Sequence, residues 1–131
     1  MRNFGLRRGA IATSIGHDAH NIVVAGVGAK DMELAVREIE KMQGGLVIVV
    51  NSKVEESLPL PVAGLMAVKS VKEVANRLNK MRDIANSLGV NRDGPFMTLS
   101  FMALTVIPEL KLTDQGLFDV SKFEKVDLII E

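Results

Sequence analysis

The strongest constraint on the fold is an apolar run in the middle of the chain. Leu46-Val47-Ile48-Val49-Val50 is continuous, mostly β-branched, and bounded by Gly45 and Asn51. Residues of this kind favour strands, and a short, uninterrupted apolar run suits the centre of a sheet. We therefore expect a central strand at 46–50, with residues 53–58 able to pair with it after a turn at Asn51-Ser52.

Further strands are predicted on both sides of this run. Residues 9–15 alternate weakly and are rich in small and β-branched side chains, and residues 22–25 read as a buried strand. Pro59 and Pro61 stop regular pairing, because proline lacks the N–H that a sheet ladder requires. Their segment is a connector or a sheet edge. A turn-rich tail at 113–116 precedes a last expected strand at 126–130.

Three helices are expected. The first has apolar residues at helical spacing, with Asp31 as N-cap and Gly44-Gly45 ending it. The second has the clearest start signal, since Ser70 and Glu73 form a capping box, and Gly89 closes it. A third, shorter helix enters at Gly94-Pro95 and continues through residues 96–104, where the nearly all-round apolar pattern indicates burial. A strand is the alternative for that stretch.

Strand pairs mixed with helices, and short links between strands, predict an α+β fold. The expected architecture is a two-layer sandwich in which a mostly antiparallel sheet is packed by about three helices. The chain has 131 residues and no repeat, low-complexity tract or break in composition. We therefore expect a single domain over residues 1–131.

Composition argues against several classes of partner. Sixteen Lys and Arg balance sixteen Asp and Glu, and neither Trp nor Tyr is present, so nothing favours nucleic acid or an anionic membrane. The longest apolar run has five residues, whereas a bilayer span needs about 20. The first eight residues do not form a signal peptide. The absence of Cys fits a cytoplasmic protein.

The segment most suited to chemistry is His17-Asp18-Ala19-His20-Asn21, which holds both histidines of the chain. From spacing alone it is as well explained by an ordinary polar turn. Two histidines and one carboxylate are at most a partial metal set, so we expect no metal site in this chain. Ser14, His17 and Asp18 lie too close in sequence to orient one another as a triad. Proton transfer or substrate hydrogen bonding stays open.

Two other patterns have simpler explanations. Gly26-Val27-Gly28 precedes a helix but lacks the third glycine of a dinucleotide-binding turn, so a tight turn is favoured. Six methionines are better explained as gap-filling core residues than as a docking face, although that face stays an alternative: they are Met32, Met42, Met66, Met81, Met97 and Met102.

Four stretches together carry a resemblance to a known family. Residues 5–12 followed by His17-Asp18-Ala19-His20-Asn21 resemble the C-terminal domain of adenine deaminases, and residues 57–66, 93–101 and 110–118 match as well, in the same order. In particular, Ser57 to Met66 reads SLPLPVAGLM, Asp93 to Phe101 reads DGPFMTLSF, and Leu110 to Phe118 reads LKLTDQGLF.

The resemblance implies a fold and a chemistry for the complete enzyme. Adenine deaminases belong to the amidohydrolase superfamily and hydrolyse adenine to hypoxanthine and ammonia at a metal centre, with Mn, Fe or Zn as the expected divalent metal, in a barrel that precedes this domain. The metal ligands of that barrel have no counterpart here. The chain alone is therefore not expected to deaminate, and a barrel domain or subunit is its expected partner.

Two departures from the family pattern bear on this reading. The family usually has Ser where this chain has Ala19, so any hydroxyl contact there is lost or unnecessary. The family also places a glycine-rich strand just before Phe4-Gly5-Leu6, where this chain begins. We expect either a fragment of a longer enzyme or a separate polypeptide that docks onto a barrel encoded elsewhere.

The leading hypothesis gives the histidine segment to an adenine pocket. His17, Asp18 and His20 are the candidate catalytic residues, and Ser14 and Asn21 are the candidate substrate contacts. A first alternative is a structural module that forms homo-oligomers through the apolar region at residues 95–104. A second is a regulatory domain that binds a purine by itself.

Overall fold

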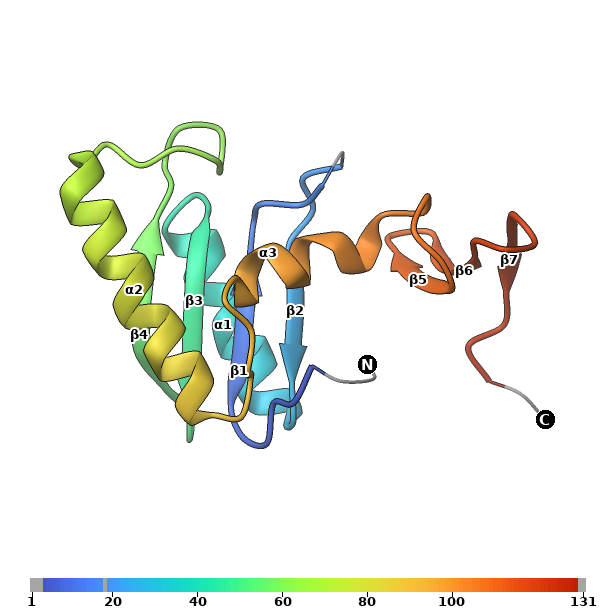
Figure 1. Ribbon diagram of the computed structural model, residues 1–131, viewed down its shortest axis with the longest axis horizontal. Helices are drawn as coiled ribbons and strands as arrows, with labels where there is room; N and C mark the ends of the chain where they lie inside the picture. The colour runs from blue at the N-terminus through green and yellow to red at the C-terminus, as the bar shows by residue number, and fades with distance from the viewer. Residues whose placement is uncertain (1–3, 18, 130–131) are drawn as a thin grey trace.

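The apolar run forms β3 (Gly45–Val50), an inner strand of a four-stranded antiparallel sheet. The computed structural model describes residues 4–17 and 19–129 and gives the strand order β2 (Val23–Gly26), β1 (Ala10–Thr13), β3, β4 (Lys53–Pro59) (Figure 1). Residues 46–49 are at most 3% exposed. The predicted central strand is confirmed.

The hairpin between β3 and β4 has the geometry that its sequence predicts. Asn51 and Ser52 both have positive φ, 52° and 59°, and the pairing resumes at once between Val50 and Lys53. Two such residues give the turn whose twist matches that of the flanking strands. β4 is one of the two edge strands and ends at Pro59, in agreement with the prediction that prolines stop the pairing here.

Helices cover both faces of this sheet. On one face, α1 (Ala29–Lys41) packs Ala35 and Ile39 against Val47 and Val49. The other face is covered by α2 (Val71–Ser87) and by α3 (Pro95–Ser100), which continues into the short 3-10 helix η1 (Phe101–Ala103). Figure 1 shows α1 behind the sheet and α2 and α3 in front of it. The α+β class is confirmed, with the antiparallel sheet as the middle layer.

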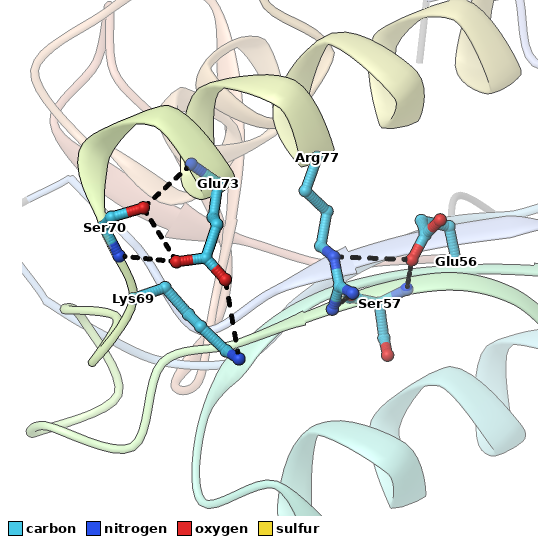
Figure 2. A network of polar contacts seen from close by, with 6 residues as sticks. All are labelled: Glu56, Ser57, Lys69, Ser70, Glu73 and Arg77. Atoms are coloured by element: carbon cyan, nitrogen blue, oxygen red, sulfur yellow. Dashed lines mark hydrogen bonds and ion pairs between the residues drawn. The ribbon is translucent and has the colours of Figure 1, made fainter.

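The two predicted helix starts have different outcomes. The capping box of α2 is confirmed, because the Glu73 N–H donates to Ser70 Oγ and the Ser70 N–H donates to Glu73 Oε2, at 3.3 and 3.1 Å (Figure 2). The prediction of Asp31 as N-cap of α1 is wrong. The cap is Gly28, and Asp31 lies in the first turn, where its carboxylate accepts the Ser52 N–H at 2.7 Å. An acidic residue there is favourable with the helix dipole.

Burial of the third helix and of the methionines is only partly as predicted. Phe96, Leu99 and Met81 are buried in the core. Met97 and Met66 are more than half exposed, so the expectation that they fill the core is wrong. α3 is a single short helix lying on the sheet, and only one side of it meets other elements.

The C-terminal region forms a second, three-stranded antiparallel sheet, here called the C-terminal meander. Its strands are β5 (Leu110–Thr113), β6 (Gly116–Asp119) and β7 (Glu124–Val126), paired in that order. The turn predicted at 113–116 is the β5–β6 hairpin. The last strand predicted at 126–130 is wrong: β7 ends at Val126, and residue 130 lies outside the described residues. Across residues 4–17 and 19–129, no helix is long and apolar enough to span a membrane.

Candidate functional site

The predicted site residues lie on the connection between β1 and β2, here called the histidine loop (residues 14–21). β1 and β2 pair antiparallel up to Thr13 and Val23, so the loop projects from one end of the sheet. His17, His20 and Asn21 are exposed. Asp18 lies outside the described residues. The structure thus brings three of the predicted residues to one solvent-facing loop.

The backbone of the histidine loop is folded back on itself. The Ala19 N–H donates to the His17 carbonyl at 3.1 Å, and the Asn21 N–H donates to the Ala19 carbonyl at 2.9 Å. A Cβ on the buried Gly16 would lie 2.2 Å from the Ala19 carbonyl oxygen, so only glycine fits this position. The local requirement for glycine was not evident from the sequence, because it arises from this close approach.

Ser14 anchors the base of the loop. Its buried hydroxyl donates to the Gly64 carbonyl at 2.6 Å and accepts the Gly45 N–H at 2.8 Å. These bonds tie the loop to the first residue of β3 and to the connection between β4 and α2. A direct substrate contact by Ser14 stays a prediction, and the geometry favours a positioning role because the hydroxyl is already engaged as donor and acceptor.

His17 rests on the end of the third helix. The backbone N–H of His17 donates to the Ser100 carbonyl at 3.2 Å, and the His17 ring lies 4.7 Å from the Phe101 ring, tilted by 43°. The imidazole is therefore supported on one side by an aromatic face and open to solvent on the other. Sequence reasoning did not single out Phe101 as a site residue. It lies 84 positions from His17 (101 − 17), and only the tertiary fold brings the two rings together.

The sequence stretches that carry the family resemblance converge at this end of the sheet. The histidine loop reaches the 57–66 stretch through Gly64 and the 93–101 stretch through Ser100 and Phe101. The 110–118 stretch forms β5 and β6, and β5 packs against η1. The four sequence stretches that resemble the family are therefore connected by contacts in the folded chain.

A cavity of about 300 Å³ lies beside the loop, between α2, α3 and the sheet. Its walls are mainly apolar, with Leu46, Leu78 and Phe96 among them, and Asn79 and Asp93 stand among its polar groups. Thr13, Ile15 and Ser100 line the side toward the histidine loop. The volume is at the lower end of the range for small-molecule sites.

The described residues do not form a metal site. No group of three His, Asp or Glu side chains within residues 4–17 and 19–129 is placed to hold an ion. The metal that the family resemblance implies therefore does not fit on the described part of this chain. No chemical step of this domain is derived through it.

A second polar cluster, on β4 and α2, holds these two elements together. Glu56 lies 3.8 Å from Arg77 Nε and accepts the Ser57 N–H, while Arg77 donates to the Ser57 carbonyl (Figure 2). Glu56 also pairs with Lys80. Burial raises the pKa of Glu56, but the hydrogen bonds and the positive charges outweigh it, so the pKa of the carboxyl falls below its ordinary value. This cluster stabilises the α2–β4 contact.

Fold and loop together define a class of protein: a small α+β domain that presents imidazole and carboxamide groups at one end of its sheet. The model of one family, described as "Adenine deaminase C-terminal domain", matches residues 1–124. The chain belongs to that family, and the resemblance seen in the four sequence stretches is confirmed.

Complete relatives are much longer than this chain. The adenine deaminase of Clostridium acetobutylicum is 53% identical over 126 residues, which cover 95% of this chain and 22% of that protein. The adenine deaminase of Petrotoga mobilis is 45% identical over 130 residues, covering 99% and 23%. That of Nitratidesulfovibrio vulgaris is 53% identical over 125 residues, covering 94% and 22%. The chain thus spans about a fifth of the length of these relatives.

Proposed function

We propose that residues 1–131 act as one domain, the C-terminal domain of an adenine deaminase, and that the histidine loop contributes to its adenine pocket. The remaining groups of that pocket, including a divalent metal such as Mn, Fe or Zn, would lie on an amidohydrolase barrel in another domain or subunit. Support comes from the family match and from the small share of each relative that the chain spans. The absence of Cys supports a cytoplasmic location.

The observation that carries this proposal is the exposed imidazole of His17 on a fixed base. A side chain held by packing and by backbone hydrogen bonds can meet a ligand without first losing much freedom. The Ser100 carbonyl and the Phe101 ring give His17 such support, while Ser14 holds the other end of the loop. An ordinary polar turn would not require these contacts from three distant segments, at Gly45, at Gly64 and at residues 100–101.

The available side chains match the edge of adenine. A carboxamide pairs with the amino group and the neighbouring ring nitrogen of adenine through two hydrogen bonds, which is the role proposed for Asn21. Deamination replaces that amino group with oxygen from water and releases ammonia, so protons must move at the ring and at the leaving nitrogen. Imidazole can donate or accept such protons. We propose this role for His17 and His20, with Asp18 beside them.

The test uses a full-length enzyme. The matched C-terminal segment of the Clostridium acetobutylicum relative is replaced by this chain, and ammonia release from adenine is measured for the chimera and for its His17→Ala, His20→Ala and Asn21→Ala variants. We expect kcat/KM to fall about tenfold or more in the histidine variants, since positioned proton transfer is worth roughly 10²–10⁴.

Lys53→Ala is the matched control, because Lys53 is exposed and begins β4 at the opposite end of the sheet. It should leave kcat/KM unchanged. Histidine variants as active as the parent chimera would contradict a role for the loop. A folded parent chimera that releases no ammonia would contradict the proposal as a whole.

A second candidate function, purine binding by the chain itself, is favoured by the cavity beside the loop. Its apolar walls and polar rim suit a flat heterocycle. The isolated chain should then show a higher Tm with adenine, by mass action on the folded state. An unchanged Tm at millimolar adenine would eliminate this candidate.

A further inference from the structure

The C-terminal meander has an apolar face on which two leucines are more than half exposed and two further apolar side chains are partly buried. The register places Leu112 opposite Leu117, and Leu117 opposite Val126, so these three side chains lie in one row on one face. Leu110 lies two residues along the same strand and shares that face. Leu110 and Leu112 are 51% and 59% exposed. This set of four is called the meander face.

The opposite side of the same strand is covered. Lys111 points away from the meander face and is only 6% exposed, and β5 packs against η1. One strand thus buries a lysine and exposes two leucines, the reverse of the distribution that water alone would favour. A three-stranded sheet needs a packed apolar face for independent stability. Within the described residues, Leu117 and Val126 on the meander face are partly buried, whereas Leu110 and Leu112 stay mostly in contact with solvent.

We propose that the meander face is the surface on which this domain packs against the rest of an adenine deaminase. This inference rests on the proposed function. The occupant is the part of the enzyme that precedes the C-terminal domain, because the relatives are four to five times longer than the segment that the chain matches. The chain matches only 22–23% of the three relatives named above, so each has ample further sequence to supply such a partner.

The position of the meander supports the same occupant. β5 follows η1, and Phe101 at the start of η1 contacts the ring of His17. The surface that docks and the loop that presents the imidazole are therefore joined through one short segment. A partner bound at the meander face would therefore lie on the same side of the domain as His17, whose ring contacts Phe101 of η1.

The face also specifies the chemistry of its partner. The row beside the three apolar side chains contains Leu110, Asp119 and Glu124, so carboxylates border the apolar patch at one end. Buried interface centres are apolar and poor in charge, whereas rims are polar. The partner surface should therefore carry aliphatic or aromatic groups at its centre and Lys or Arg beside Asp119 and Glu124.

Leu112→Lys tests this inference in two settings, the isolated chain and the chimera with the Clostridium acetobutylicum enzyme. In the isolated chain the side chain faces solvent, so Tm should stay within about 2 °C. In the chimera an ammonium group would be buried in an apolar contact, and the first unfolding transition should fall by about 5 °C or more. Val27→Lys is the control, because Val27 is 61% exposed on the turn before α1.

Several results would overturn the inference. A chimera as stable with Leu112→Lys as without it would show that the preceding part of the enzyme does not cover this face. An equal fall in the isolated chain would show that the face packs within the domain. A dimeric isolated chain that Leu112→Lys makes monomeric, with an unchanged chimera, would assign the face to a second copy. Because the readout is stability, a stable but inactive chimera would contradict only the proposed function.

Discussion

The four-stranded sheet and the C-terminal meander both carry aliphatic side chains, but the first buries them and the second leaves two leucines exposed. β3 is apolar throughout and buried on both faces, because α1 covers one side and α2 and α3 cover the other. β5 also carries aliphatic side chains, but only its lysine side is covered. The main sheet is covered on both faces within the described chain, whereas the meander leaves two leucines exposed, and we infer that these leucines meet a partner outside the chain.

The largest expected effect tests the self-sufficient half of this comparison. Met81 on α2 is fully buried within the core cluster that includes Ile48 and Leu99. Met81→Ala should lower the free energy of unfolding by about 2–5 kcal/mol, from lost transfer energy and a residual cavity. Urea unfolding followed by far-UV circular dichroism measures this, and suits a chain without Trp or Tyr. Loss below about 1 kcal/mol would mean that this helix is not packed as described.

The second effect tests how firmly the main sheet holds the histidine loop. Ser14→Ala removes the hydroxyl that joins Gly64 and Gly45, and it leaves the Gly45 N–H without that acceptor in a buried site. We expect a loss of about 1–3 kcal/mol. Ser87→Ala serves as the control, since its exposed hydroxyl bonds only to the Ile84 carbonyl within α2. Equal losses in the two serine variants would argue against Ser14 as an anchor.

The third effect depends on pH and concerns the edge of the main sheet. The folded state lowers the pKa of Glu56, so ionised Glu56 stabilises the fold above the ordinary carboxyl pKa, and that contribution is lost as pH falls through the lowered value. Glu56→Gln should cost about 1 kcal/mol at pH 7. Urea unfolding at pH 7 and near pH 3 should show the difference from wild type shrinking on acidification.

Glu33→Gln is the comparison for this carboxylate. Glu33 pairs with Arg37 on the exposed side of α1, and both side chains are mostly in solvent. Exposed pairs of this kind contribute little, so no change in the urea midpoint is expected. A difference between wild type and Glu56→Gln that grew on acidification would contradict the sign argued from the ion cluster.

The sequence predicted the strands of the main sheet better than those of the C-terminal meander. The apolar run of β3, the Asn51-Ser52 hairpin and the Ser70–Glu73 capping box are local signals, and each was confirmed. β5 and β6 were not predicted from the sequence, because Leu-Lys-Leu-Thr alternates over only four positions and runs directly into turn residues, so the strand signal is short.

The histidine loop shows the same limit for the site. Its residue types were evident from sequence, but its supports were not. The Ser14–Gly64 bond joins residues 50 positions apart, and Phe101 reaches His17 only after α3 has packed on the sheet. The resemblance to a family drew attention to the right stretches without showing that they meet.

The smallest expected effect returns to the meander. Leu110→Ser in the isolated chain should change the free energy of unfolding by less than about 0.5 kcal/mol, because the side chain is half exposed and loses little packing. The same substitution in the chimera should cost more, since a covered leucine there would leave a hydroxyl in an apolar contact. Urea midpoints of both proteins measure the pair. Two equal values would mean that the meander is as self-sufficient as the main sheet, and the contrast between the two regions would then reflect sequence alone and not a missing partner.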